Sequence, residues 1–237
     1  MVTPLAYFDL VETFAKPGCA VCRLVLRDVD RFLTSVMYER VNKSDTHRAF
    51  RNARGLCNEH SWQLTQGKGN ALGIATLYEV AVAEVIKVMR EGTSEWDRTR
   101  LRNNKTERNA KALADSLLPS GPCIACELLA DSEKDYIGEL SRKIADPQLQ
   151  EAYRASEGLC LPHFRQVLYK TRNMQHLEQF IEIQGAIWDR LRADLHEFID
   201  KNKHERMHEA MGPEGNSWLR AIEQLSGAKG VFGPEPH

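Results

Sequence analysis

The sequence lacks an excess of charge of either sign. It contains 32 Lys and Arg residues against 33 Asp and Glu residues, which gives a formal net charge of −1 at pH 7. A chain with this balance has no overall field that would draw it to a polyanion or to an anionic membrane surface. The basic segment from Arg98 to Arg108 has one aromatic neighbour, Trp96, and we interpret it as a solvated connection. We therefore expect no nucleic-acid binding.

Long apolar runs are also missing. No window of about 18 residues is free of charged side chains, so we expect no membrane-spanning helix. Near the N-terminus, Asp9 and Glu12 interrupt the apolar residues, so we expect no signal peptide. These absences predict a cytoplasmic protein, in which six cysteines paired as structural disulfides would be out of place.

Cysteine is absent outside two similar stretches. Each stretch contains a CxxC pair and, further on, a G-x-C-x-x-H segment. The intervals between the second cysteine of the pair and the third cysteine are 34 and 33 residues. The matching positions are offset by 104 residues at the first cysteine and by 103 at the histidine, which indicates an internal duplication. The eight residues are Cys19, Cys22, Cys57 and His60 in the first copy, and Cys123, Cys126, Cys160 and His163 in the second.

This residue set matches the requirements of a metal site. Two cysteines three positions apart can both reach one ion from a tight turn, and a CxxH pair does the same with one sulfur and one nitrogen. Four such ligands complete the tetrahedral shell that Zn²⁺ prefers. We therefore predict two Cys3His sites holding two zinc ions. The same ligands suit iron–sulfur clusters, and two dithiol pairs for redox exchange are a third possibility.

We expect each site to form within one copy. A helix of roughly 16 to 18 residues would separate the CxxC pair from a shorter returning helix, so that each copy closes as a hairpin. Gly55 and Gly158 suit the left-handed position that ends the returning helix just before the third cysteine. Pairing of one copy's CxxC with the other copy's CxxH is the alternative.

Apolar residues recur at helical spacing throughout, and no segment has the alternation of a strand. We predict an all-α fold, an internally duplicated helical bundle of two hairpin repeats, each clipped by a Cys3His site. The helix from Asn70 to Glu91 is apolar nearly all round, so we expect it to be central and buried. The expected parts are a first repeat (1–92), a basic linker (93–109), a second repeat with a long helix from about Met174 (110–211), and a flexible tail (212–237).

The tail contains a short amphipathic segment, Ser217 to Leu225. We expect it to dock through Trp218, Ile222 and Leu225.

A second metal motif stands near the end of the long helix. His204-Glu205-Arg206-Met207-His208 matches H-E-x-x-H, in which two histidines on one helix face bind zinc and the glutamate acts as general base. Its surroundings are highly charged, whereas such a helix normally lies under an apolar substrate cleft. We interpret the match as chance spacing on a solvated helix end, and a zinc-dependent hydrolase remains the enzyme hypothesis.

The CxxC pair, the Tyr38-Glu39-Arg40-Val41-Asn42 stretch and the Arg54-to-His60 segment together resemble an uncharacterised family of bacterial helical proteins with duplicated CxxC and G-x-C-x-x-H elements. The resemblance covers most of the chain and implies a bacterial protein, without implying an activity. The sequence therefore predicts a non-enzymatic metal-binding protein that acts as an interaction or regulatory module on a protein partner. An iron–sulfur electron carrier is the alternative.

Overall fold

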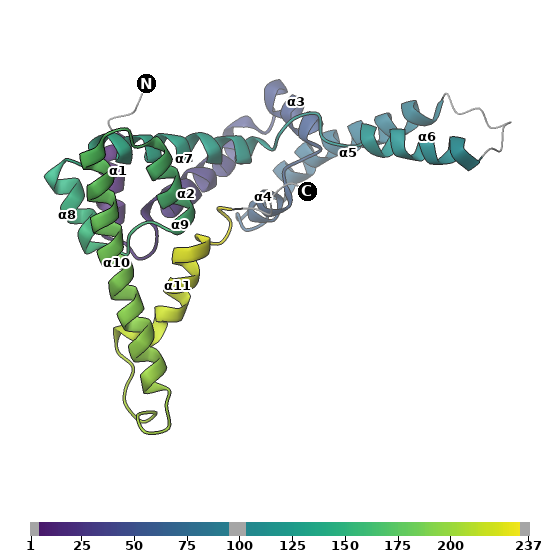
Figure 1. The fold of residues 1–237 in the computed structure, drawn as a ribbon. Helices are drawn as coiled ribbons and strands as arrows, with labels where there is room; N and C mark the ends of the chain where they lie inside the picture. Colours follow the sequence, from purple (N-terminus) through teal and green to yellow (C-terminus); the bar gives the residue numbers. More distant parts are fainter. Residues whose placement is uncertain (1–4, 95–102, 233–237) are drawn as a thin grey trace. The chain divides into compact units, whose positions relative to one another are not determined.

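The computed structural model describes residues 5–94 and 103–232, and every regular element in these two ranges is a helix. The all-α prediction is confirmed (Figure 1). The elements are α1 (Leu5–Phe14), α2 (Ala20–Ser35), the π-helical turn η1 (Val36–Arg40), α3 (Ser44–Ala53), α4 (Asn58–Leu64), α5 (Ala71–Ser94), α6 (Asn103–Ser116), α7 (Ile124–Lys143), α8 (Pro147–Ala155), α9 (Leu161–Lys170), α10 (Met174–Lys201), the 3₁₀ turn η2 (Pro213–Asn216) and α11 (Ser217–Ser226).

The helices form two compact units that exchange segments between the two halves of the sequence. Unit 1 combines residues 1–28 with 129–237, and unit 2 comprises residues 29–128. Both boundaries fall inside helices, α2 and α7. These units differ from the expected division at 92 and 110, because each takes its CxxC pair from one copy and its CxxH pair from the other. The internal duplication itself stays a prediction.

In unit 1, α1 packs on α8, and α10 packs on α8 and α11 (Figure 1). Its core is continuous around the ring of Tyr153, which is fully buried and stacks on Phe14 at 5.0 Å between ring centroids. The Tyr153 hydroxyl donates to Gln184 Oε1 at 2.6 Å, and the Leu159 N–H donates to the same oxygen at 2.9 Å. A buried amide of α10 thereby fixes the backbone directly before Cys160.

In unit 2, α5 packs against α3 and α6. The helix α3 ends with two residues in the left-handed region, Arg54 (φ 57°) and Gly55 (φ 98°), and the Gly55 N–H donates to the Phe50 carbonyl at 2.9 Å. A side chain at Gly55 would meet the Tyr78 ring at 3.0 Å. The predicted left-handed glycine at a helix end is confirmed at Gly55. Gly158 also has a positive φ of 84°, but α8 ends earlier, at Ala155.

The expectation that the helix from Asn70 to Glu91 is central and buried was wrong. Leu77 and Ala81 of α5 are buried, but other apolar side chains of α5 are exposed, with Leu72 at 80% and Val82 at 54%. Apolar character all round a helix predicts burial only when enough neighbouring elements exist to cover it. Within the described part of unit 2, α3 and α6 cover one side of α5.

The expected linker is partly helical. The helix α5 continues to Ser94 and α6 begins at Asn103, whereas the sequence suggested a helix from Ala110. Residues 95–102, which include the basic positions Arg98, Arg100 and Arg102, lie outside the described residues.

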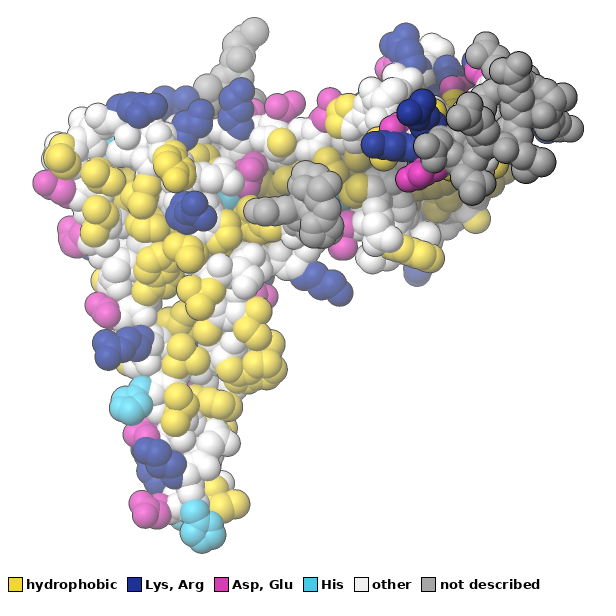
Figure 2. Space-filling model, turned by 45° about the vertical axis from the view of Figure 1, so that its right-hand side comes forward, with side chains coloured by type: hydrophobic (Ala, Val, Ile, Leu, Met, Phe, Trp, Pro, Cys, Tyr) yellow, Lys and Arg dark blue, Asp and Glu magenta, His cyan; other side chains and the backbone are white. Residues whose placement is uncertain are grey.

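The amphipathic segment at the end of the chain forms α11, but not with the expected face inward. Its buried residues are Ser217 and Gln224, while Trp218, Ile222 and Leu225 are about half exposed or more. Gln224 anchors the helix, because its side chain accepts from the Trp188 indole N–H at 3.0 Å and donates to the Glu157 carbonyl at 2.7 Å. Apolar side chains consequently lie uncovered along this part of the surface in Figure 2.

Candidate metal centres

Two groups of four metal-binding side chains gather in the structure, and each draws on both copies of the motif. Site A contains Cys19, Cys22, Cys160 and His163, and site B contains Cys57, His60, Cys123 and Cys126. Within each group the ligand atoms all lie within 4.8 Å of one another. All eight predicted residues are therefore brought together, as two sets of the predicted Cys3His composition.

The expected pairing within each copy is contradicted by these groups. The helix that follows each CxxC pair is longer than the helix that precedes the CxxH pair of the same copy, so the chain does not return to its starting point. In the first copy α2 and η1 carry the chain about 30 Å away from Cys22, whereas the ten residues of α3 span about 15 Å. The same holds in the second copy, where α7 has 20 residues and α8 has 9. Each returning segment thus meets the other copy's CxxC pair.

Site A has the spacing of a single tetrahedral ion. The His163 Nδ1 atom lies 3.4 Å from Cys19 Sγ, 3.3 Å from Cys22 Sγ and 3.2 Å from Cys160 Sγ. The sulfurs of Cys22 and Cys160 are 3.7 Å apart. For one zinc ion with ordinary bond lengths, neighbouring sulfurs lie about 3.8 Å apart, and sulfur and nitrogen about 3.5 Å. The donor atoms therefore fit around one such ion.

A carboxylate orients the histidine of site A. The His163 Nε2 atom lies 2.9 Å from Glu133 Oε1, and the Gln166 amide donates to the same oxygen at 2.8 Å. A proton on Nε2 would leave the Nδ1 lone pair directed at the three sulfurs. Carboxylate partners of this kind fix the tautomer of metal-binding histidines and raise their basicity. Sequence reasoning missed Glu133, because it follows the CxxC pair of site B by seven residues yet serves site A.

The last described segment folds over site A. The Ala228 N–H donates to Cys22 Sγ at 3.5 Å, and the Phe232 ring lies 5.0 Å from the His163 ring. Gly227 (φ 83°) makes this approach possible, since an added Cβ would lie 2.4 Å from the Phe232 ring. Residues 227–232, expected to be part of a flexible tail, thus cover the site, and all four of its ligand residues are buried.

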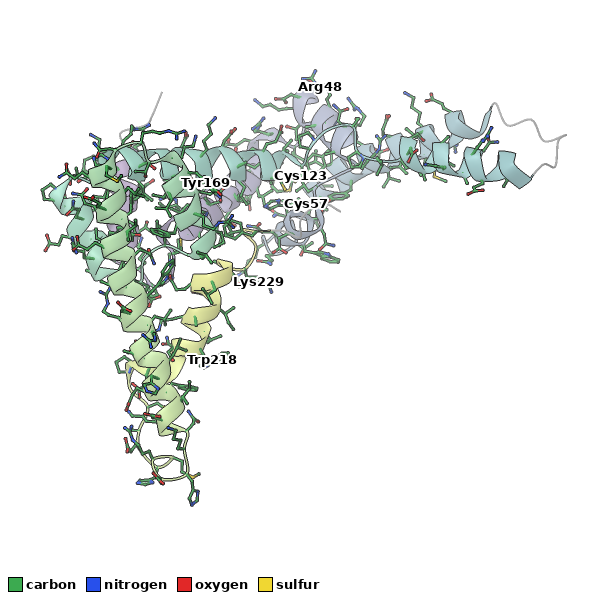
Figure 3. All side chains as sticks on the ribbon, in the orientation of Figure 1. Arg48, Cys57, Cys123, Tyr169, Trp218 and Lys229 are labelled. Carbon is green, nitrogen blue, oxygen red and sulfur yellow. The ribbon has the colours of Figure 1, made fainter. Side chains whose placement is uncertain are left out.

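Site B has similar distances in a more open setting. His60 Nδ1 lies 3.1 Å from Cys57 Sγ and 3.4 Å from Cys126 Sγ, and those two sulfurs are 3.5 Å apart. Cys123 Sγ lies 3.7 Å from the same nitrogen, and Figure 3 shows Cys57 and Cys123 close together. Only His60 is buried, while the three cysteines are partly exposed.

The two sites differ in their supporting contacts. By the 104-residue offset, the position equivalent to Glu133 is Val29, whose side chain cannot accept a hydrogen bond. Among the described residues, no carboxylate lies within hydrogen-bond distance of His60. Site A is thus the closed and supported site, and site B is the accessible one.

In each site the surroundings lower the pKa of one thiol and raise the pKa of the other two. Burial would raise the pKa of the Cys19 thiol, but hydrogen bonds from the other three residues of site A hold it well below its ordinary value. Burial opposes protonation of His163, yet its hydrogen bonds raise the pKa of its imidazole to about 11. In site B burial would raise the pKa of Cys123, but hydrogen bonds from His60 and from nearby backbone N–H groups together lower it to about 6. Each cluster therefore holds a thiolate, the form that binds metal.

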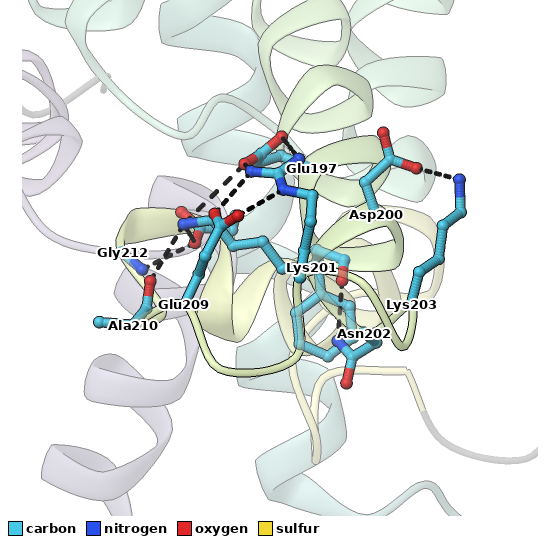
Figure 4. Close-up of polar contacts among 11 residues, drawn as sticks. Glu197, Asp200, Lys201, Asn202, Lys203, Glu209, Ala210 and Gly212 are labelled. Atoms are coloured by element: carbon cyan, nitrogen blue, oxygen red, sulfur yellow. Dashed lines mark hydrogen bonds and ion pairs between the residues drawn. The ribbon is translucent and has the colours of Figure 1, made fainter.

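The H-E-x-x-H match lacks the helix that it requires. The helix α10 ends at Lys201, and residues 202–210 form turns. Ion pairs hold this segment, since Arg206 contacts Glu197 at 2.7 Å and Glu209 at 2.8 Å (Figure 4). His204 and His208 therefore do not share a helix face, and no metal-binding group within the described residues includes them.

Comparison with known proteins agrees with the resemblance noted in the sequence. Residues 1–230 match the family of unknown function DUF6062. The chain belongs to the DUF6062 family. It is also 24% identical over 224 residues to the "Uncharacterized 23.9 kDa protein in xynA 3'region" of Caldicellulosiruptor sp. (strain Rt8B.4), an alignment that covers 93% of this chain and 100% of the relative. No solved structure matches. In this DUF6062 protein no described helix is long and apolar enough to cross a membrane.

The contact between Glu133 and His163 leads to a prediction for metal affinity. A Glu133→Gln variant is expected to bind metal at site A about 10- to 100-fold more weakly, because the neutral amide supports the imidazole less well than a carboxylate. Competition with a chromophoric chelator measures the affinity of each site. The matched control is Asp131→Asn, an exposed acidic residue on the same helix. Equal losses of metal affinity at site A in the two variants would show that the Glu133 carboxylate does not support metal binding by His163.

Proposed function

We propose that this DUF6062 protein is a non-enzymatic zinc protein in which one ion closes each unit. The observation that carries the proposal is the set of donor distances in site A, which suits one tetrahedral ion and leaves no coordination position for a substrate. Closed four-ligand shells are typical of structural zinc, whereas catalytic zinc keeps a position for water. All six cysteines are free thiols, as a metal site requires and as a reducing compartment such as the cytoplasm allows.

The iron–sulfur alternative uses the same eight residues. A cluster distributes its protein ligands over two or four iron atoms, which needs more room between the donors than a single ion does. Donor atoms within 4.8 Å of one another therefore support single ions. A redox role of free dithiol pairs is less well supported, because it leaves both histidines without a purpose.

Elemental analysis of protein purified without oxygen tests the proposal. We expect about two zinc atoms per chain, no visible absorbance, and a loss of helical signal on chelation. Several iron atoms with sulfide, and absorbance that bleaches on reduction, would instead identify an electron carrier. Six titratable thiols with no metal would refute both metal hypotheses.

We further propose that the module acts through a protein partner. The support is the exposed apolar face of α11, where Trp218 is 48% and Ile222 is 56% exposed. A photo-crosslinking residue at position 218, used in living cells, tests this. An adduct of one defined mass that disappears in an Ile222→Asp variant supports the proposal, and no adduct above background contradicts it.

A further inference from the structure

A hollow on unit 1 gathers positive charge from three elements. It has a volume of about 700 Å³ and lies between the second half of α7, the end of α9 and the start of α10. Its charged lining consists of Lys134, Arg142, Lys143, Lys170 and Arg172, against one carboxylate, Asp135. Five cations around one hollow stand out in a chain with a net charge of −1. Lys and Arg side chains lie close together along the upper edge of Figure 2.

Local structure explains only part of this cluster. Arg142 and Lys143 in the last turn of α7, and Lys170 in the last turn of α9, complement the helix dipoles. That reason does not extend to Lys134, in the middle of α7, or to Arg172, between two helices. Arg142 pairs with Glu139, but no ion pair in the described part of the chain involves Lys134, Lys170 or Arg172. Protein carboxylates therefore relieve the mutual repulsion of these cations only in part.

The floor of the hollow contains a glycine that packing does not require. Gly138 lies in the interior of α7, where glycine costs about 1 kcal/mol relative to alanine. A Cβ at this position would meet only the Arg142 side chain, at 3.7 Å, which is an ordinary contact. A side chain longer than alanine at this position would extend into the hollow.

We propose that this hollow binds a small polyphosphate anion. Guanidinium and ammonium groups are the usual partners of phosphoryl oxygens, and the volume lies in the range of small-molecule sites. A single phosphate would use two or three of the five cations, so a chain of two or more phosphoryl groups fits the charge better.

A neighbouring hollow can indicate the source of the phosphates. It has a volume of about 320 Å³, shares Lys134 and Lys170 with the first, and is lined by Tyr169. Tyr169 is 72% exposed, so its ring is free to stack on a base (Figure 3). A nucleoside polyphosphate would use both hollows, and inorganic polyphosphate only the first.

Calorimetric titration of the metal-loaded full chain with inorganic tripolyphosphate and with ATP, at low salt, tests the proposal. We expect both to bind, and a Lys170→Ala/Arg172→Ala variant to bind at least about tenfold more weakly, from the loss of two charged contacts. A Gly138→Leu variant should also bind more weakly with all charges intact. ATP binding tighter than tripolyphosphate, with the difference lost in Tyr169→Ala, identifies a nucleotide as the source, and equal affinities identify inorganic polyphosphate.

Matched controls are Arg48→Ala on α3 and Lys229→Ala after α11, both exposed cations that line neither hollow. They should change the affinity less than about twofold, with metal content and helicity unchanged in every variant. Equal losses in the control variants would overturn the proposal, since they would indicate general charge attraction. The absence of binding by either anion, or binding of long nucleic acid alone, would overturn it as well.

Discussion

A Cys160→Ser variant is expected to keep one of two metal ions and to lose most of the stability of unit 1. Site A joins residues that are 138 to 144 positions apart, so a bound ion would hold the start of α2 to α9 across most of the chain. Structural zinc contributes about 10 kcal/mol or more of apparent binding free energy, which is comparable with the whole stability of a domain. Without the ion, three buried polar groups would also remain in the core.

Thermal unfolding followed by circular dichroism measures this effect. We expect the free energy of unfolding of unit 1 to fall by at least about 4 kcal/mol, which lowers the midpoint temperature on the order of 10 °C. Cys57→Ser is the matched control, because it removes an equivalent donor from site B in the other unit. An unchanged transition of unit 1 in Cys160→Ser, at full loss of the ion, would show that site A is not structural.

Stepwise chelation is expected to remove the ion of site B first. Its cysteines are partly exposed and no described carboxylate contacts its histidine, whereas site A is buried under residues 227–232 and supported by Glu133. Loss of such a partner alone changes metal affinity about 10- to 100-fold. We therefore expect a stable intermediate with one zinc ion per chain.

Alkylation during chelation, read by mass spectrometry of peptides, identifies which thiols become free. Cys57, Cys123 and Cys126 should be labelled at least about tenfold faster than the three cysteines of site A, because solvent reaches them and their ion leaves earlier. Untreated protein and protein unfolded in denaturant give the two limits of labelling. Simultaneous labelling of all six cysteines would contradict the difference between the sites.

The ligands and the helices could be predicted from the sequence for physical reasons. Ligand chemistry is local, since CxxC and CxxH are each defined by spacing within one turn. Helix ends are local as well, as at Gly55, where the left-handed backbone favours glycine. The long helix α10 follows from a sustained apolar stripe over 28 residues.

Which CxxC pair joins which CxxH pair could not be predicted from the sequence. Both pairings use identical ligand types, so the motifs alone do not choose between them. The choice between pairing within a copy and pairing between copies depends on helix lengths. The helices α3 and α8 are about half as long as the helical segments that precede them. Glu133 was missed for the same reason, because its role appears only once α7 is known to carry ligands of site B and to support site A.

The burial of α5 and α11 was also predicted wrongly from the sequence. The apolar residues of α5 and α11 predict that these helices are covered, but burial also requires neighbouring helices that pack on them. The fold anchors α11 through Gln224 instead, with its amide between Trp188 and the Glu157 carbonyl. Its apolar side chains Trp218, Ile222 and Leu225 are exposed, and this exposure is the support for the proposed partner.

Metal counting in paired cysteine variants tests the central claim, that each ion joins both copies of the motif. Each single Cys→Ser variant should retain one zinc ion. Cys22→Ser/Cys160→Ser removes two donors from site A alone and is expected to retain one ion per chain, whereas Cys22→Ser/Cys57→Ser damages both sites and should retain none. The reverse result, with one ion in the Cys22/Cys57 variant and none in the Cys22/Cys160 variant, would show that the sites form within each copy and would contradict this account.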